Sequence, residues 1–342
     1  MIRPHQRIGV YLGRVVMILA LIGAMWMAGC ASPEHTARPP ESAASPGARQ
    51  EALPTLTPVT LAEGQRLRVV ASTSIIGDVV AHVGDGLVEL TVLMGPGQDP
   101  HGYEPTAKDI AAISEAHVIF INGLGLEEGL ERTIKAAADR GQPVIAVSTG
   151  VPAREMHLSG QEGTGRPDPH TWFDPNNVIL WVNNIEGALS ALDPVHASEY
   201  AANAEVYRQQ LRELDAYIRE QVARIPPERR KLVADHLVLG YFAARYGFEV
   251  IGAVIPGFST VAEPSASDLA RLTALVHEAG VPTIFVGRTM NPRMTQVLAE
   301  EVGARVLPLY TGALGEPGSG AEDYISMMRT NVDTIVEGLS HP

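Results

Sequence analysis

Residues 194–225 read PVHASEYAANAEVYRQQLRELDAYIREQVARI, and they set the architecture that we expect. Asp193 can cap a helix here, Pro194 suits its first turn, and Pro226 and Pro227 end it. Apolar side chains recur on one helical face, at Tyr200, Tyr207, Leu211, Leu214, Ile218 and Val222. Such a helix would be about 45 Å long at 1.5 Å per residue. We expect it to join two lobes as a rigid link; a surface helix of one domain or a short coiled coil are the other interpretations.

Short β-branched segments alternate with helical patterns on both sides of this helix. The expected strands are Arg66–Thr73, Val88–Met94, His117–Asn122 and Pro143–Ser148 before it, and Lys231–Asp235, Glu249–Ile255, Thr283–Gly287 and Arg305–Tyr310 after it. This alternation predicts an α/β fold of two lobes, each a mostly parallel sheet flanked by helices. We place the lobes at 61–193 and 226–342, with the linking helix at 194–225.

The N-terminus has the features of a secretory signal. Three arginines precede the apolar run Val15–Ala28, which ends in Gly29 and Cys30. The run is short for a transmembrane span. Residues 1–30 resemble a bacterial lipoprotein signal, in which the cysteine becomes the lipidated first residue. The other interpretation is an ordinary secretory peptide with an incidental cysteine, but Cys30 is the only cysteine in the chain.

Residues 31–60 are rich in Pro, Ala, Ser, Glu and Thr, and they predict a flexible tether. The formal net charge is −13, which argues against nucleic acid and against adsorption to anionic lipid. We therefore expect an extracytoplasmic protein, at the cell surface or in the periplasm, whose membrane contact is the lipid anchor on Cys30.

Three histidines lie in distinctive local sequences. They are His101 in DPHGYEPT (99–106), His170 in DPHTWFDP (168–175) and His236 in HLVLGYFAARYG (236–247). All three follow expected strands or precede expected helices, where parallel α/β sheets place their ligand crevices. Neutral imidazole is the commonest protein ligand for first-row transition metals. A single histidine is more often structural, but the shared Asp-Pro-His of two of them leads us to expect one metal site built from all three.

Neighbouring side chains can support such a site. Carboxylates that could accept the second ring N–H belong to Asp99, Asp168 and Asp235. Aromatic rings that could wall the ion from water belong to Trp172, Tyr103 and Tyr241. Of the other histidines only His157, in the loop 156–166, is a doubtful candidate.

These segments, together with GLGLE (123–127) and YISMMRTN (324–331), resemble the zinc/manganese-binding solute receptors of bacterial ABC importers. The similarity extends in order over residues 66–340. It implies two α/β lobes joined by a rigid helix, one metal ion between them, and delivery of that ion to a membrane permease. By motif, the ligands of the family fall on His101, His170 and His236.

The resemblance fails at one position. The fourth ligand of the family is commonly an aspartate near the C-terminal end, and the matching stretch here is TGAL (311–314), with Gly312 at the ligand position. Water, Glu316 or Asp323 could complete the coordination instead, or it could stay incomplete.

Two other functions remain open at this point. Zinc held by three histidines could activate water in an extracellular metallohydrolase, with Asp99 or Glu104 as general base, although the chain has no His-Glu-x-x-His motif. The metal could also be structural in a surface adhesin. We expect a monomeric receptor rather than an enzyme, and Zn(II) rather than Mn(II), because three imidazoles without a carboxylate favour zinc.

Overall fold

The computed structural model describes residues 54–155 and 166–340. The signal segment with Cys30, the tether up to residue 53, and His157 lie outside these ranges. Within the described ranges, no helix combines the length and the apolar character needed to cross a membrane.

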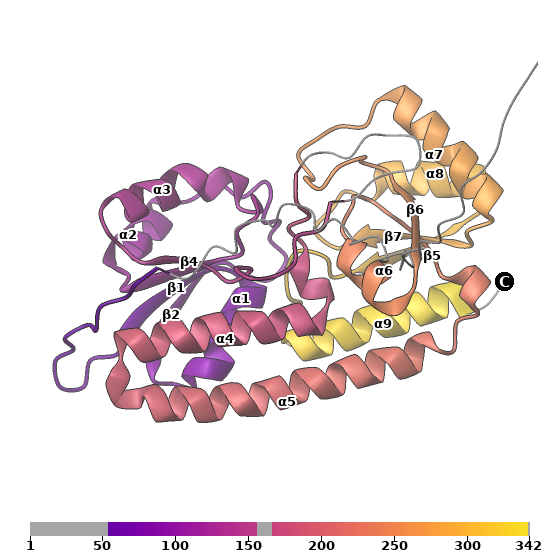
Figure 1. The fold of residues 1–342 in the computed structure, drawn as a ribbon. Helices are drawn as coiled ribbons and strands as arrows, with labels where there is room; N and C mark the ends of the chain where they lie inside the picture. The colour runs from indigo at the N-terminus through magenta and orange to yellow at the C-terminus, as the bar shows by residue number, and fades with distance from the viewer. Residues whose placement is uncertain (1–53, 156–165, 341–342) are drawn as a thin grey trace, which may run out of the picture. The chain divides into compact units, whose positions relative to one another are not determined.

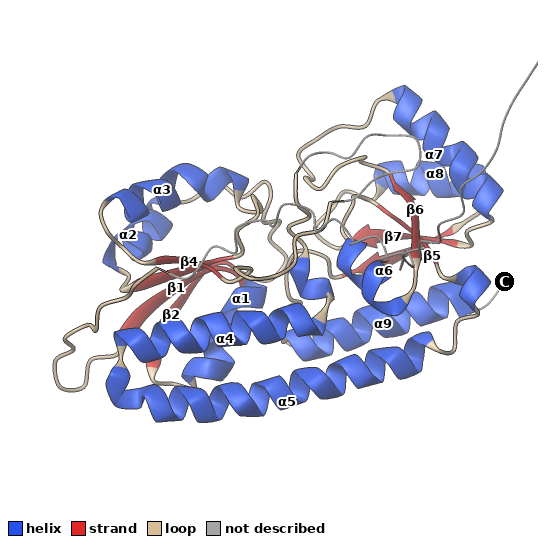
Figure 2. Cartoon of the chain, viewed as in Figure 1, coloured by secondary structure: helices blue, strands red, loops and turns tan. Residues whose placement is uncertain are grey.

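The described residues form two four-stranded sheets, and the strands within each sheet are parallel (Figure 2). The first has the order β2-β1-β3-β4, with strands β1 (Leu67–Thr73), β2 (Val88–Met94), β3 (Val118–Ile121) and β4 (Val144–Ala146). The second has the order β6-β5-β7-β8, with strands β5 (Lys231–Ala234), β6 (Glu249–Ala253), β7 (Thr283–Gly287) and β8 (Arg305–Leu309). The sequence prediction of two parallel-sheet lobes is confirmed.

Most of the helices connect consecutive parallel strands, as such crossovers require, and the last helix of each lobe follows its last strand. In the first lobe they are α1 (Ser74–Gly84), α2 (Ala107–Glu115), α3 (Glu131–Asp139) and α4 (Pro175–Leu192). In the second they are α6 (Gly240–Tyr246), α7 (Ala266–Ala279), α8 (Arg293–Val302) and α9 (Tyr324–Ser340). Their starts follow from the sequence: Thr106 with Asp109, and Ser265 with Asp268, form capping boxes at α2 and α7.

The linking helix is α5 (Ala197–Val222), preceded by the short 3-10 turn Pro194–His196 (Figure 1). Its 26 residues span about 39 Å. The expected cap by Asp193 is wrong: its carboxylate accepts hydrogen bonds from the side chains of His196 and Tyr200. One face of α5 is buried and packs against α1 and α4 of the first lobe and against α9 of the second. A single hydrophobic core therefore continues from one lobe to the other along this helix.

The chain just before β1 contacts the first lobe. Residues 54–61 have no regular secondary structure, but Leu56, Val59 and Leu61 pack against its core. The backbone N–H of Val59 also donates to the carbonyl of Leu192 at 2.8 Å. The last part of the expected tether is thus attached to the folded body.

Candidate metal centre

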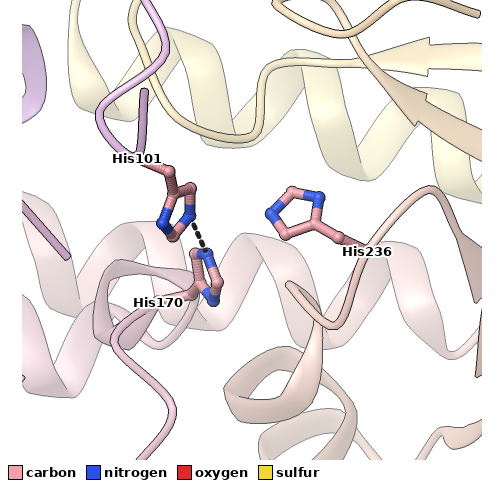
Figure 3. A group of neighbouring side chains, drawn as sticks. All are labelled: His101, His170 and His236. Atoms are coloured by element: carbon pink, nitrogen blue, oxygen red, sulfur yellow. Dashed lines mark hydrogen bonds between the residues drawn. The ribbon is translucent and has the colours of Figure 1, made fainter. Parts of the chain in front are cut away.

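The structure brings His101, His170 and His236 together. His101 lies in the loop after β2, His170 in the loop before α4, and His236 directly after β5. Each offers one ring nitrogen, and these nitrogens all lie within 4.8 Å of one another (Figure 3). The side chains are 4%, 1% and 3% exposed, so the centre is shielded from bulk water. Among the described residues, no other group of potential metal ligands is found.

Two of the rings are oriented by aspartates. Oδ1 of Asp168 lies 2.8 Å from Nδ1 of His170, and Oδ1 of Asp235 lies 2.8 Å from Nδ1 of His236. Each aspartate also accepts the backbone N–H of its histidine. A carboxylate on Nδ1 keeps the proton there and leaves Nε2 as a lone-pair donor. The expectation for Asp168 and Asp235 is confirmed.

The third ring lacks this support. The expectation that Asp99 accepts a ring proton of His101 is wrong: Oδ1 of Asp99 accepts the backbone N–H of His101 at 3.1 Å, and Oδ2 accepts the hydroxyl of Thr260 at 2.6 Å. Nε2 of His101 lies 3.1 Å from Nε2 of His170. Nδ1 of His101 points to the opposite side of its ring (Figure 3) and, among the described residues, it is buried without a hydrogen-bond partner.

Burial sets the protonation of the centre. It lowers the pKa of His101 to about 2, with help from the neighbouring histidines, and it holds the pKa of His170 well below its ordinary value. Both rings are therefore neutral, as metal ligation requires. Burial raises the pKa of Asp168 to about 7, against the opposing effect of the His170 backbone hydrogen bond. Burial also opposes the ionised form of Asp235, but the charge and hydrogen bonds of His236 outweigh it and keep this pKa low.

Aromatic side chains surround part of the centre. Trp172 packs edge-on against His170, with ring centroids 5.3 Å apart, and Tyr241 hydrogen-bonds to the carbonyl of Asp168. The expectation for Tyr103 is wrong, because its hydroxyl donates to Asp109 and to the carbonyl of Leu93 and its ring packs in a separate core cluster.

The carboxylates suggested as a fourth ligand do not join the three histidines. Glu316 is exposed, and Asp323 accepts the backbone N–H of Ser326 at the start of α9. At Gly312, an added Cβ would lie 2.8 Å from Cδ of Pro100, beside the loop that carries His101. The TGAL segment is therefore next to the centre, but it carries no donor side chain at residue 312.

A cavity of about 200 Å³ adjoins the centre. It is lined by His101, Leu124, Gly125, Glu128, Arg166, Pro167, Pro169, Gly257, Phe258, Ser259 and Ala262. Phe258 also lies against His170, with ring centroids 6.4 Å apart. Sequence reasoning missed Phe258 and Thr260, because neither is a usual metal ligand and only the fold brings their loop to the histidines.

Comparisons with known proteins agree with this architecture. The manganese-binding lipoprotein MntA of Halalkalibacterium halodurans is 38% identical over 282 residues, which cover 82% of this chain and 91% of the relative. The zinc-binding protein TroA of Treponema pallidum is 37% identical over 289 residues, covering 82% and 90%.

Solved structures show the same fold. The periplasmic zinc-binding protein TroA of Treponema pallidum superposes with a TM-score of 0.75 at 34% identity, covering 81% of this chain and all of that structure. A manganese-bound periplasmic metal-binding protein from Candidatus Liberibacter asiaticus gives a TM-score of 0.70 at 28% identity, covering 80% of this chain. The family model for zinc-uptake complex component A periplasmic (ZnuA) matches residues 69–338, and the chain belongs to this family.

Proposed function

We propose that this chain is an extracytoplasmic receptor that captures one transition-metal ion between its lobes and delivers it to an ABC permease. The observation that carries the proposal is the buried triangle of ring nitrogens from His101, His170 and His236. The triangle draws one ligand from the second lobe and two from the first, so a bound ion links the lobes. A permease can then recognise the closed form.

Zinc is the ion that the donor set favours. Zn(II) takes imidazole nitrogen at about 2.0–2.1 Å, in sites with four ligands. Three neutral imidazoles bind Zn(II) above Mn(II) at equal concentration. The relatives include a protein named for zinc and others named for manganese. We therefore keep both Zn(II) and Mn(II) as ions that the receptor is proposed to bind.

Neither of the other two functions has support from a specific observation. A hydrolase would need a base close to metal-bound water, but Asp99 is engaged by Thr260 and Glu104 is exposed. Nothing in the centre distinguishes an adhesin from a receptor, whereas curated relatives are named as substrate-binding lipoproteins of ABC transporters.

The remaining parts of the proposal concern the whole chain. Curated relatives are named lipoproteins, which supports attachment through Cys30. We also propose that residues 1–30 are the signal, 31–60 the tether, and 61–193 and 226–342 the two metal-binding lobes of a monomer.

Metal content tests the function directly. The mature protein, purified without added metal and dialysed against equal Zn(II) and Mn(II), should hold one ion per chain, mostly zinc. A variant carrying His101→Ala, His170→Ala and His236→Ala should hold none. Equal metal content in parent and triple variant would refute the site, and hydrolysis of ester or peptide substrates by the zinc-loaded parent would support the enzyme instead.

A further inference from the structure

The three histidines leave a coordination position for a donor from outside the chain. Structural zinc sites have four protein ligands, and a site with three protein ligands takes its fourth from water or a bound molecule. Among the described residues, the group of potential ligands contains only His101, His170 and His236. This argument rests on the function proposed above.

The nearby carboxylates each hold other groups through at least one oxygen, and none of them joins the group of potential ligands; Oδ2 of Asp168 is buried without a hydrogen-bond partner among the described residues. Oδ1 of Asp168 and Oδ1 of Asp235 hold the Nδ1 atoms of two of the histidines, and Oδ2 of Asp235 accepts the backbone N–H of Gly287 at 2.6 Å. Both oxygens of Asp99 are engaged, by the backbone of His101 and by Thr260. Rotating Asp99, Asp168 or Asp235 toward the metal would disturb the hydrogen bonds that their other oxygens make to the ligand histidines or to the opposite lobe.

The cavity described above gives an outside donor a place to lie. It borders His101 directly, and Pro169 and Phe258 in its wall are next to His170. Its volume of about 200 Å³ is several times the roughly 30 Å³ that one water occupies in the liquid. Exposed side chains of both signs, Arg166 and Glu128, contribute to the lining, so charge does not bar a small anion.

The ring of His101 also has an unsatisfied polar atom on the side away from the other histidines. When the metal takes Nε2 of His101, the proton of the neutral ring must lie on Nδ1. That atom is buried and has no hydrogen-bond partner among the described residues. A buried donor without an acceptor costs about 1–3 kcal/mol, so a water that reached Nδ1 would stabilise the metal-bound form, separately from the fourth donor on the Nε2 side.

We propose that the receptor binds its metal as a ternary complex, in which a small carboxylate anion entering through this cavity supplies the fourth donor. The cargo is then a metal ion together with a simple carboxylate, with water in its place when none is present. Selectivity among metals would depend on the anions in the medium as well as on the three histidines.

Cobalt(II) and azide test this proposal on the mature protein. Co(II) replaces zinc and has visible absorption bands that depend on its ligands, and azide is a small anion that changes these bands when it coordinates. We expect azide to shift the bands of the Co(II)-loaded parent with saturation, and acetate to compete with it. No shift at full Co(II) occupancy, release of Co(II) by azide, or no competition by acetate would each overturn the proposal.

A cavity variant tests where the anion enters. Ala262 is an exposed wall residue, and Ala262→Leu adds bulk there, whereas Ala262→Ser nearly preserves the volume. At equal Co(II) occupancy, we expect the leucine variant to bind azide about tenfold more weakly than the serine variant. The larger leucine side chain would occupy part of the cavity through which the azide enters. Equal azide affinities would overturn the assignment to this cavity. Failure of the parent to bind Co(II) at all would instead refute the proposed function.

Discussion

The hydroxyl of Thr260 donates a 2.6 Å hydrogen bond to Oδ2 of Asp99, across 161 positions of sequence. Thr260 belongs to the second lobe and Asp99 to the first. The other oxygen of Asp99 accepts the backbone N–H of His101, so the same carboxylate holds the loop of a candidate metal ligand and the opposite lobe. The bond requires the two loops to be together, and it therefore stabilises the closed form.

Removing this hydroxyl should speed metal release. Thr260→Val keeps the shape of the side chain but deletes a hydrogen bond to a carboxylate, which is worth about 1.5–3 kcal/mol. Because solvent reaches this loop, we expect a loss near the lower end of this free-energy range. That loss corresponds to an increase of about tenfold in the rate of zinc release. Stopped-flow transfer of zinc to a chelator measures the rate. Thr260→Ser should behave like the parent, and a valine variant as slow as the parent would show that the bond does not hold the closed form.

The aspartates on the histidine rings should matter for affinity. Asp168→Asn or Asp235→Asn weakens the hold on Nδ1 and the basicity of Nε2, and we expect zinc affinity to fall by about 10- to 100-fold. Competition titration against a chelating dye measures it.

Asp193→Asn provides the matched control, because Asp193 holds Nδ1 of His196 at 2.7 Å and His196 is not in the metal group. Its zinc affinity should equal that of the parent. Unchanged affinity in both site variants would show that the rings keep their orientation without the aspartates.

The sequence predicted the architecture well, for identifiable reasons. The apolar period of α5 and the β-branched strands are local patterns, and the strands Val88–Met94 and Thr283–Gly287 begin and end where expected. The predicted start of α5 is three residues too early, because Pro194 opens a separate 3-10 turn and the carboxylate of Asp193 binds side chains.

Only part of the candidate metal site could be predicted from the sequence. Two of the three aspartate roles follow from adjacency in sequence, since Asp168 and Asp235 lie within two residues of the histidines that they orient. Asp99 has the same spacing from His101, yet a threonine far along the chain takes its carboxylate. No local pattern contains that contact, and the same holds for Phe258 and the cavity.

Proton release should reveal neutral rings before metal binding. Three histidines of ordinary pKa, near 6.5, would be mostly protonated at pH 5.5 and would release nearly three protons to zinc. Here the pKa of His101 is about 2 and that of His170 is far below the usual range, so these rings have no proton to release at pH 5.5. We expect about two protons at most, one from the rings and one from Asp168, whose pKa of about 7 leaves it protonated at pH 5.5; calorimetry in buffers of different ionisation enthalpy measures the total. Release near three would contradict the buried, neutral centre.

Substitutions at Gly312 separate crowding from coordination. A Cβ there would lie 2.8 Å from Cδ of Pro100, so Gly312→Ala and Gly312→Asp should both weaken closure and lower zinc affinity. Only the aspartate adds an anionic oxygen, which favours manganese more than alanine does. We expect the Mn/Zn affinity ratio of the aspartate variant to exceed that of the alanine variant by about tenfold, or about 1.4 kcal/mol. Equal ratios, in variants of equal thermal stability, would show that residue 312 does not face the ion.

One ion should lie among the three histidines, and an anomalous-scattering crystal structure at the zinc absorption edge would locate it. We expect a single strong peak per chain, about 2.0–2.1 Å from Nε2 of His101, His170 and His236. A zinc peak away from these rings, or none in protein that contains zinc, would contradict it.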